Sequence, residues 1–124
     1  MKRPLAYITA AWSGNEIKDM GQASKYCRAV YEAGFSPICP LLFMPLYTNN
    51  EIPEEHQSVL DMSHDLLRRS RVLVVCGHQV DETVRNDIAI AAILSITATT
   101  LDGILTVRAH ERLNDVINNP RRGG

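Results

Sequence analysis

The chain has 124 residues, of which 45% are hydrophobic, and its 13 basic and 14 acidic side chains leave a formal charge of -1. This length fits one domain with one buried core. The near-neutral charge argues against a nucleic-acid polymer as partner, because such binders carry a basic stripe. No stretch approaches the roughly 18 apolar residues of a membrane span. No secretory leader precedes the first predicted strand, so we expect no membrane partner either.

The first third of the chain predicts two strands around one helix. The apolar run at residues 5–11 predicts a buried strand. A turn at 12–15 leads into a helix from residue 16, whose apolar residues recur every three or four positions. Gly34 is the type of residue that ends a helix, and residues 35–39 predict the second strand.

A long loop is expected at residues 40–53. It contains Pro40, Pro45 and Pro53 together with an unusual number of apolar side chains. Long loops in small domains are functional or disordered, and an apolar loop is poorly suited to disorder. We therefore expect this loop to cover a pocket or a subunit contact.

The second half predicts two more helices and two more strands. A proline followed by acidic residues predicts a helix over about 53–69. Residues 72–76 are apolar throughout and predict a central strand that is buried on both faces. We expect a third helix over about 82–101, a break at residues 102–103, and the last strand at 104–107.

Alternating strands and helices predict the α/β class. We expect a single Rossmann-like (flavodoxin-like) domain at residues 1–107, with a parallel sheet of four to five strands and helices on both faces. Residues 108–124 are expected to form a polar tail that is partly helical or disordered. Ligands of such sheets bind beyond the carboxyl ends of the strands, here at residues 10–15, from Pro40 onward, and at 77–83.

The cysteines and histidines indicate neither a metal nor another cofactor. Cys27, Cys39 and Cys76 are widely spaced and contain no CxxC pair, which predicts a reduced, cytoplasmic protein without a zinc site. The histidines, His64 among them, have neither the spacing of metal ligands nor a matched carboxylate partner in the predicted elements.

Small polar residues follow the first predicted strand. Thr9, Trp12, Ser13, Gly14 and Asn15 surround the start of a helix, where a phosphate or a sugar hydroxyl can bind. The same residues also suit an ordinary capped turn. Trp12 can stack on a base or pack beneath the long loop.

Two carboxylates are candidates for catalysis. Asp65 lies near the end of the second predicted helix, and Asp87 lies early in the third. Both are expected near the carboxyl edge or rim of the sheet. Glycosyl chemistry uses such a pair, one as nucleophile and one as proton donor. The alternative is that both are solvated helix carboxylates.

Three segments carry a resemblance to a known family: residues 6–12 (AYITAAW), residues 62–77, and residues 84–104. Over about residues 5–107 the chain resembles the nucleoside 2-deoxyribosyltransferase-like superfamily, in particular a small branch found in bacteria and their mobile elements. The resemblance implies cleavage of the N-glycosidic bond of 2'-deoxynucleosides or their 5'-monophosphates. The sugar then passes to another base or to water.

The resemblance also implies roles for individual residues. Tyr7 matches the tyrosine that orients the nucleophile, and Asp65 matches the aspartate that protonates and binds the leaving base. Asp87 stands where the family has its nucleophilic glutamate, and Asn86 beside it is expected to bind substrate. Two departures from the pattern are that Asp87 is one methylene shorter than glutamate and that Thr83 and Val84 stand in place of a glycine.

Three functions follow from these observations. The first is an N-deoxyribosyltransferase or deoxynucleotide N-glycosidase that acts on a small nucleoside or nucleotide. The second is a non-catalytic module that binds or sequesters a nucleotide in the same pocket. The third is an interaction protein in which the third helix and residues 41–47 build an oligomer. Relatives in the resembled family also lead us to expect a homo-oligomer, a dimer or larger.

Overall fold

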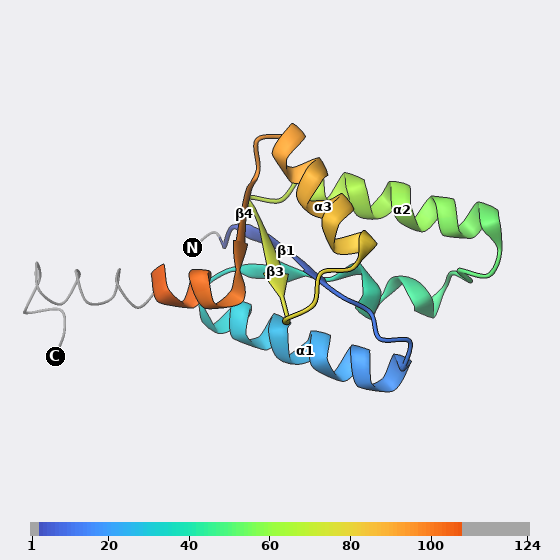
Figure 1. Ribbon diagram of the computed structural model, residues 1–124, viewed down its shortest axis with the longest axis horizontal. Helices are drawn as coiled ribbons and strands as arrows, with labels where there is room; N and C mark the ends of the chain where they lie inside the picture. Colours follow the sequence, from blue (N-terminus) through green and yellow to red (C-terminus); the bar gives the residue numbers. More distant parts are fainter. Residues whose placement is uncertain (1–2, 108–124) are drawn as a thin grey trace, which may run out of the picture.

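Four parallel strands form the centre of the protein in the computed structural model, which describes residues 3–107. The strands are β1 (Leu5–Ala10), β2 (Ser36–Ile38), β3 (Val72–Cys76) and β4 (Thr97–Thr100), and their order across the sheet is β2-β1-β3-β4 (Figure 1). All three neighbouring pairs are parallel. The expected α/β class and parallel Rossmann-like sheet are therefore confirmed.

Helices cover both faces of the sheet (Figure 1). On one face lie α1 (Glu16–Glu32) and a helix that begins at residue 101 and continues to residue 107. On the other face lie α2 (Pro53–Arg68) and α3 (Glu82–Ile93). This arrangement follows from the strand order. The α1 helix connects β1 to β2 on one side of β1, whereas α2 and α3 lead to β3 and β4 on its other side. Right-handed crossovers that run in opposite directions along a sheet place their helices on opposite faces.

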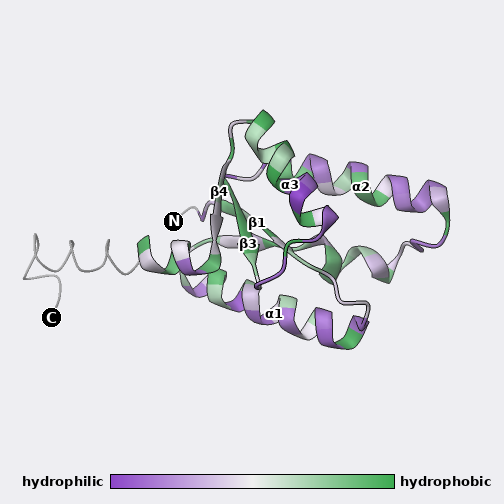
Figure 2. Ribbon diagram, viewed as in Figure 1, coloured by the Kyte–Doolittle hydropathy of each residue, from purple (hydrophilic) through white to green (hydrophobic). Residues whose placement is uncertain are grey.

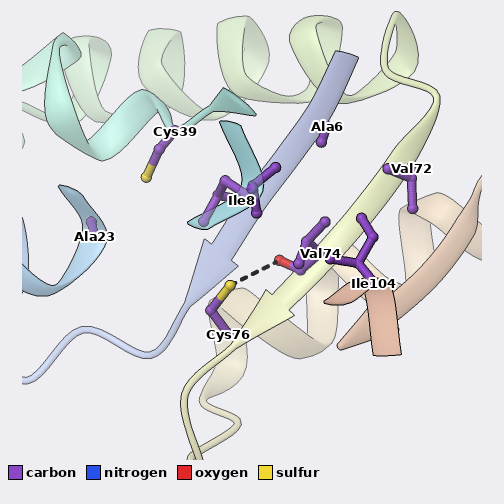
Figure 3. Packing of buried hydrophobic residues seen from close by; sticks show 9 residues of the cluster. Ala6, Ile8, Ala23, Cys39, Val72, Val74, Cys76 and Ile104 are labelled. Carbon is purple, nitrogen blue, oxygen red and sulfur yellow. Dashed lines mark hydrogen bonds between the residues drawn. The ribbon is translucent and has the colours of Figure 1, made fainter. Parts of the chain in front are cut away.

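Alternate residues of the strands supply two separate layers of core. Ala6 and Ile8 of β1 pack with Val72 and Val74 of β3 on the α1 side (Figure 3). Tyr7, one position along, packs on the α2 and α3 side of the sheet. This alternation is the two-residue period of a strand, and both faces are apolar because helices cover both. In Figure 2, β1 and β3 are coloured as more hydrophobic segments than α1 and α2.

The C-terminal part of the domain differs from the prediction. The helix expected over 82–101 ends at Ile93, the chain turns at Ser95 with a positive φ of 58°, and β4 occupies Thr97–Thr100. The strand expected at 104–107 is instead part of a helix. The prediction was wrong because β4 is an exposed edge strand rich in threonine, so it lacks the apolar run of a buried strand.

Gly103 has a different role from the one predicted. We expected it to break a helix, but it lies inside the helix that follows β4. A Cβ atom at this position would lie 2.5 Å from the Thr99 Oγ1 atom. Gly103 therefore allows close approach of the helix to the strand that precedes it. The predicted tail at 108–124 lies outside the described residues.

No helix within residues 3–107 combines the length and the apolar character needed to cross a membrane. The α1 helix ends as the sequence predicted, since Gly34 adopts a positive φ of 100° just beyond it.

Candidate functional site

A cavity of about 560 Å³ opens at the carboxyl edge of the sheet. Its volume falls within the range of roughly 300–1,000 Å³ that is usual for small-molecule sites. The end of β1 and the start of α3 form its floor, α2 forms one side, and the segment 40–51 forms another. This segment contains two short 3-10 helices, η1 (Pro40–Leu42) and η2 (Met44–Leu46). The expectation that the long loop covers a pocket is confirmed.

Asp87 provides a buried carboxylate in this cavity, with a side chain that is 5% exposed. Its Oδ2 atom accepts a hydrogen bond from the Thr9 hydroxyl at 2.7 Å. Burial raises the pKa of Asp87 because desolvation disfavours the charged carboxylate. The Thr9 hydrogen bond and the nearby His64 act in the opposite direction, and Asp81 raises the pKa further.

Tyr7 also lines the cavity and lies within electrostatic range of this carboxylate. Burial raises the pKa of Tyr7 well above its ordinary value, and the charge of Asp87 raises it further. A hydrogen bond with Ser63 lowers this pKa by less. Tyr7 is therefore a protonated phenol at neutral pH and can donate a hydrogen bond to a carboxylate or a ligand.

One face of α2 looks into the cavity. The residues of α2 that line the cavity recur at the three- and four-residue spacing of a single helix face. They are His56, Val59, Leu60, Ser63 and His64. The sequence predicted no carboxylate partner for His64, whereas the structure places it near Asp87 of α3. This proximity joins two helices that are adjacent on the same face of the sheet.

Asp81 joins the loop after β1 to the start of α3. Its Oδ1 atom accepts a hydrogen bond from the Val84 amide at 2.9 Å and so caps α3. Its Oδ2 atom accepts a hydrogen bond from the Trp12 amide at 3.1 Å. One carboxylate thus fixes two segments of the cavity wall that are far apart in the sequence.

Five of the predicted site residues meet at the cavity. They are Tyr7, Thr9, Trp12, Gly14 and Asp87. Thr9 was expected to bind substrate; it lines the cavity, and its hydroxyl donates a hydrogen bond to Asp87.

Asp65 does not join this group. It lies on the solvent side of α2, where its carboxylate pairs with Arg69 at 3.0 Å and with Arg68 at 3.7 Å. Its side chain is 45% exposed and does not line the cavity. A step of one residue from His64 turns the side chain by about 100° around the helix, which is why these neighbours face different surroundings.

Three further predicted residues also lie outside the cavity. The Ser13 hydroxyl donates a hydrogen bond to Asp19 at 2.6 Å, and Asn15 caps α1 by accepting a hydrogen bond from the Lys18 amide. Asn86 is exposed on the outer side of α3. The ordinary capped turn, which the sequence left open as an alternative, therefore describes Ser13 and Asn15.

The sequence analysis missed the polar residues that α2 and the loop bring to the site. Ser63 and His64 were not assigned to the site, and neither were the cavity residues Asn49, Asn50 and Glu51. The available indication was the presence of polar residues within the apolar stripe of α2, because a stripe that only packs against a core is apolar. Among residues 3–107, no cluster of three or more metal-ligating side chains is present.

Comparison with known proteins gives a family and no activity. No curated protein matches the chain. Residues 4–101 match the model of a family described as a domain of unknown function, DUF7768, and this span contains the whole cavity. Because the match covers most of the chain, the protein belongs to the DUF7768 family.

Proposed function

We propose that the protein cleaves the N-glycosidic bond of a 2'-deoxynucleoside or its 5'-monophosphate, with Asp87 as nucleophile. The observation that carries this proposal is a buried carboxylate in a cavity of about 560 Å³, with a protonated phenol and a histidine beside it. A deoxyribosyl centre becomes cation-like as its base departs, and a carboxylate held in a desolvated cavity stabilises that charge.

The proposed reaction has two displacements. The Oδ1 atom of Asp87 attacks C1' of the sugar, the bond from C1' to the base nitrogen breaks, and the electron pair stays on that nitrogen. His64 gives the nitrogen a proton, in the role that the family resemblance assigned to Asp65. Water or a second base then attacks C1', gives its proton to His64, and releases the Asp87 carboxylate.

The assignment of Oδ1 follows from the hydrogen bonds of Asp87. Thr9 donates to Oδ2 at 2.7 Å and keeps the carboxylate in one orientation. Tyr7, a protonated phenol within electrostatic range of the carboxylate, can act as a second donor. A fixed nucleophile avoids the loss of roughly 100-fold that a displacement of about 1 Å can cause.

The test is base release from the four deoxynucleosides and their monophosphates, with and without a free acceptor base. Asp87→Asn should abolish release, because the amide is not a nucleophile. Asp65→Asn is the matched control and should leave the rate unchanged, since Asp65 lies outside the cavity. Absence of turnover by the folded wild-type protein would overturn the proposal, and loss of turnover in Asp65→Asn would return the acid role to Asp65.

A second candidate is a non-catalytic module that binds the same nucleotides. The observation that favours it is the burial of Asp87, which raises its pKa and so favours the neutral carboxyl, a poor nucleophile. Thermal stabilisation by a deoxynucleoside monophosphate without base release would support this candidate.

We also propose a homo-oligomer that works in the cytoplasm. Large apolar side chains are exposed around the cavity wall, among them Leu46 at 78% and Tyr47 at 61%, and Ile93 at 81% is exposed on α3. The three cysteines are free thiols, which suits a reducing compartment. Light scattering should give a dimer or larger, and replacement of Leu46 and Tyr47 by glutamate should reduce the mass. A monomeric wild-type protein at micromolar concentration would contradict the oligomer.

A further inference from the structure

All three cysteines of the chain gather on the α1 face of the sheet. Cys39, at the end of β2, and Cys76, at the end of β3, are buried in one hydrophobic cluster, and Cys27 of α1 packs against that cluster. In Figure 3, the sulfur of Cys39 points toward the part of α1 that carries Ala23. Cys27 lies four residues after Ala23 and so shares its helix face.

Cys27 and Cys39 form a pair within this cluster. Their thiols are joined by a hydrogen bond, which lowers the pKa of Cys27 and raises that of Cys39. The cause is that the Cys39 S–H group stabilises a thiolate on Cys27, whereas partial burial of Cys27 opposes this effect. Cys27 is the less buried thiol of the pair and the one whose pKa is lowered, so it is the better placed of the two to react as a thiolate.

Cys76 is outside this pairing. Burial raises the pKa of Cys76 to about 12, and its Sγ atom contacts the Val74 carbonyl oxygen at 3.9 Å (Figure 3). Cys76 therefore stays a neutral thiol and is a poor nucleophile.

Part of the cysteine cluster borders a cavity. A second cavity of about 160 Å³ opens at the carboxyl edge of the sheet, and Cys39 and Cys76 line it together with Tyr26 of α1. Cys27 itself is only partly buried. A partly exposed thiol with a lowered pKa beside a second thiol is the arrangement that favours reversible oxidation.

We propose that Cys27 and Cys39 form a peroxide-sensitive dithiol that closes to an intramolecular disulfide. The Cys27 thiolate attacks one oxygen of hydrogen peroxide, the O–O bond breaks, and the departing hydroxide takes a proton to become water. The sulfur of Cys39 then loses its proton and attacks the sulfenic sulfur of Cys27, and the S–O bond breaks to release a second water. Two thiols are oxidised and one peroxide is reduced to two waters.

The modification site borders the large cavity. Cys39 directly precedes Pro40, the first residue of η1, and both Pro40 and Leu41 line the large cavity. Closure of the disulfide would tie the start of this wall segment to α1. The proposal concerns thiol chemistry and does not depend on the proposed glycosidic activity.

Peptide mapping of the full chain tests the proposal directly. Trypsin cleaves after Lys25, Arg28, Arg68, Arg71 and Arg85, so each cysteine falls on a separate peptide. The folded protein is treated with a small excess of hydrogen peroxide, its remaining thiols are alkylated after unfolding, and the digest is analysed without reduction. We expect the loss of two thiols per chain and a linkage between peptides 26–28 and 29–68, reversed by dithiothreitol.

Single substitutions separate the roles of the three thiols. Cys76→Ser should still lose two thiols, whereas Cys27→Ser should form no disulfide. Cys39→Ser should stop at a sulfenic acid on Cys27, which dimedone traps. The wild-type protein alone can overturn the proposal. It would do so if all three thiols were still alkylated after peroxide treatment, or if the disulfide included Cys76.

Discussion

The hydroxyl of Thr9 donates a hydrogen bond of 2.7 Å to the Oδ2 atom of Asp87, and the two residues are 78 positions apart in the chain. Both side chains are buried, so the bond is shielded from water. It joins the end of β1 to α3 and fixes the orientation of the carboxylate that we propose as nucleophile.

Thr9→Val should raise the pKa of Asp87. Valine has nearly the same shape as threonine but donates no hydrogen bond, and the Thr9 bond is one of the two interactions that lower this pKa. The ionised carboxylate would lose its donor, at a cost of about 1–3 kcal/mol in the free energy of unfolding. Urea unfolding measures this cost. A pH–rate profile should show the acidic limb moved to higher pH, and an unmoved limb would show that the bond does not tune the nucleophile.

Asp87→Asn should gain stability relative to the wild type as pH rises. The pKa of Asp87 is raised in the folded state above the unfolded value of 3.8. Below that value the carboxyl is protonated in both states and ionisation has no effect. Between the unfolded and folded pKa values the folded state binds more protons, so the stability of the wild type falls with rising pH.

Asparagine does not ionise, so its contribution stays constant over the same range. The difference in the free energy of unfolding between the two proteins should therefore grow as pH rises through the folded pKa of Asp87. Unfolding curves at a series of pH values measure it. The exposed Asp65→Asn serves as control, and a difference independent of pH would mean that Asp87 is not a desolvated carboxylate.

Tyr7→Phe should lower turnover by about 100-fold, which is the lower end of the loss caused by removal of one donor from a charge-stabilising site. The ring of Tyr7 packs against Leu67 and Leu73, and phenylalanine keeps that packing. Stability should therefore change by no more than about 1.5 kcal/mol, the value of one hydrogen bond. Steady-state kinetics and thermal unfolding on the same sample separate the two effects. An unchanged turnover would remove Tyr7 from the mechanism.

Asp81→Ala should loosen two segments at once. It removes the cap of α3, which is worth about 0.5–2 kcal/mol, and it removes the acceptor of the Trp12 amide. Trp12 is the only tryptophan of the chain, so its fluorescence reports on this loop without labelling. Asp81→Asn retains one acceptor oxygen and should have the smaller effect on both stability and emission. Equal effects of the two substitutions would contradict the double role of Asp81.

The fold was largely predictable because buried strands and amphipathic helices leave clear patterns. Residues 72–76 are apolar throughout, and the structure places β3 there. The last strand was misplaced because an edge strand is stabilised by its one neighbour and needs no apolar run. The apolar residues 104–107 instead belong to a helix, and Ile104 is buried against the sheet.

The site was predictable only in part. The segments next to the strand ends, with Tyr7 and Asp87, are fixed by the parallel topology. The approach of His64 to Asp87 depends on how α2 packs beside α3, and neither sequence segment contains that information. The solvent-facing position of Asp65 depends on the rotation of α2 about its own axis, which its mixed apolar pattern did not determine.

Three prolines, Pro40, Pro45 and Pro53, stand within or next to the segment that walls the large cavity. Each proline ring holds its φ near one value, so the unbound segment samples few shapes. The cavity wall would then already have its bound shape before a ligand arrives. Binding would therefore carry only a small entropic cost for ordering this segment. The rate of association should consequently be set by diffusion into the cavity mouth rather than by a slow rearrangement of the chain.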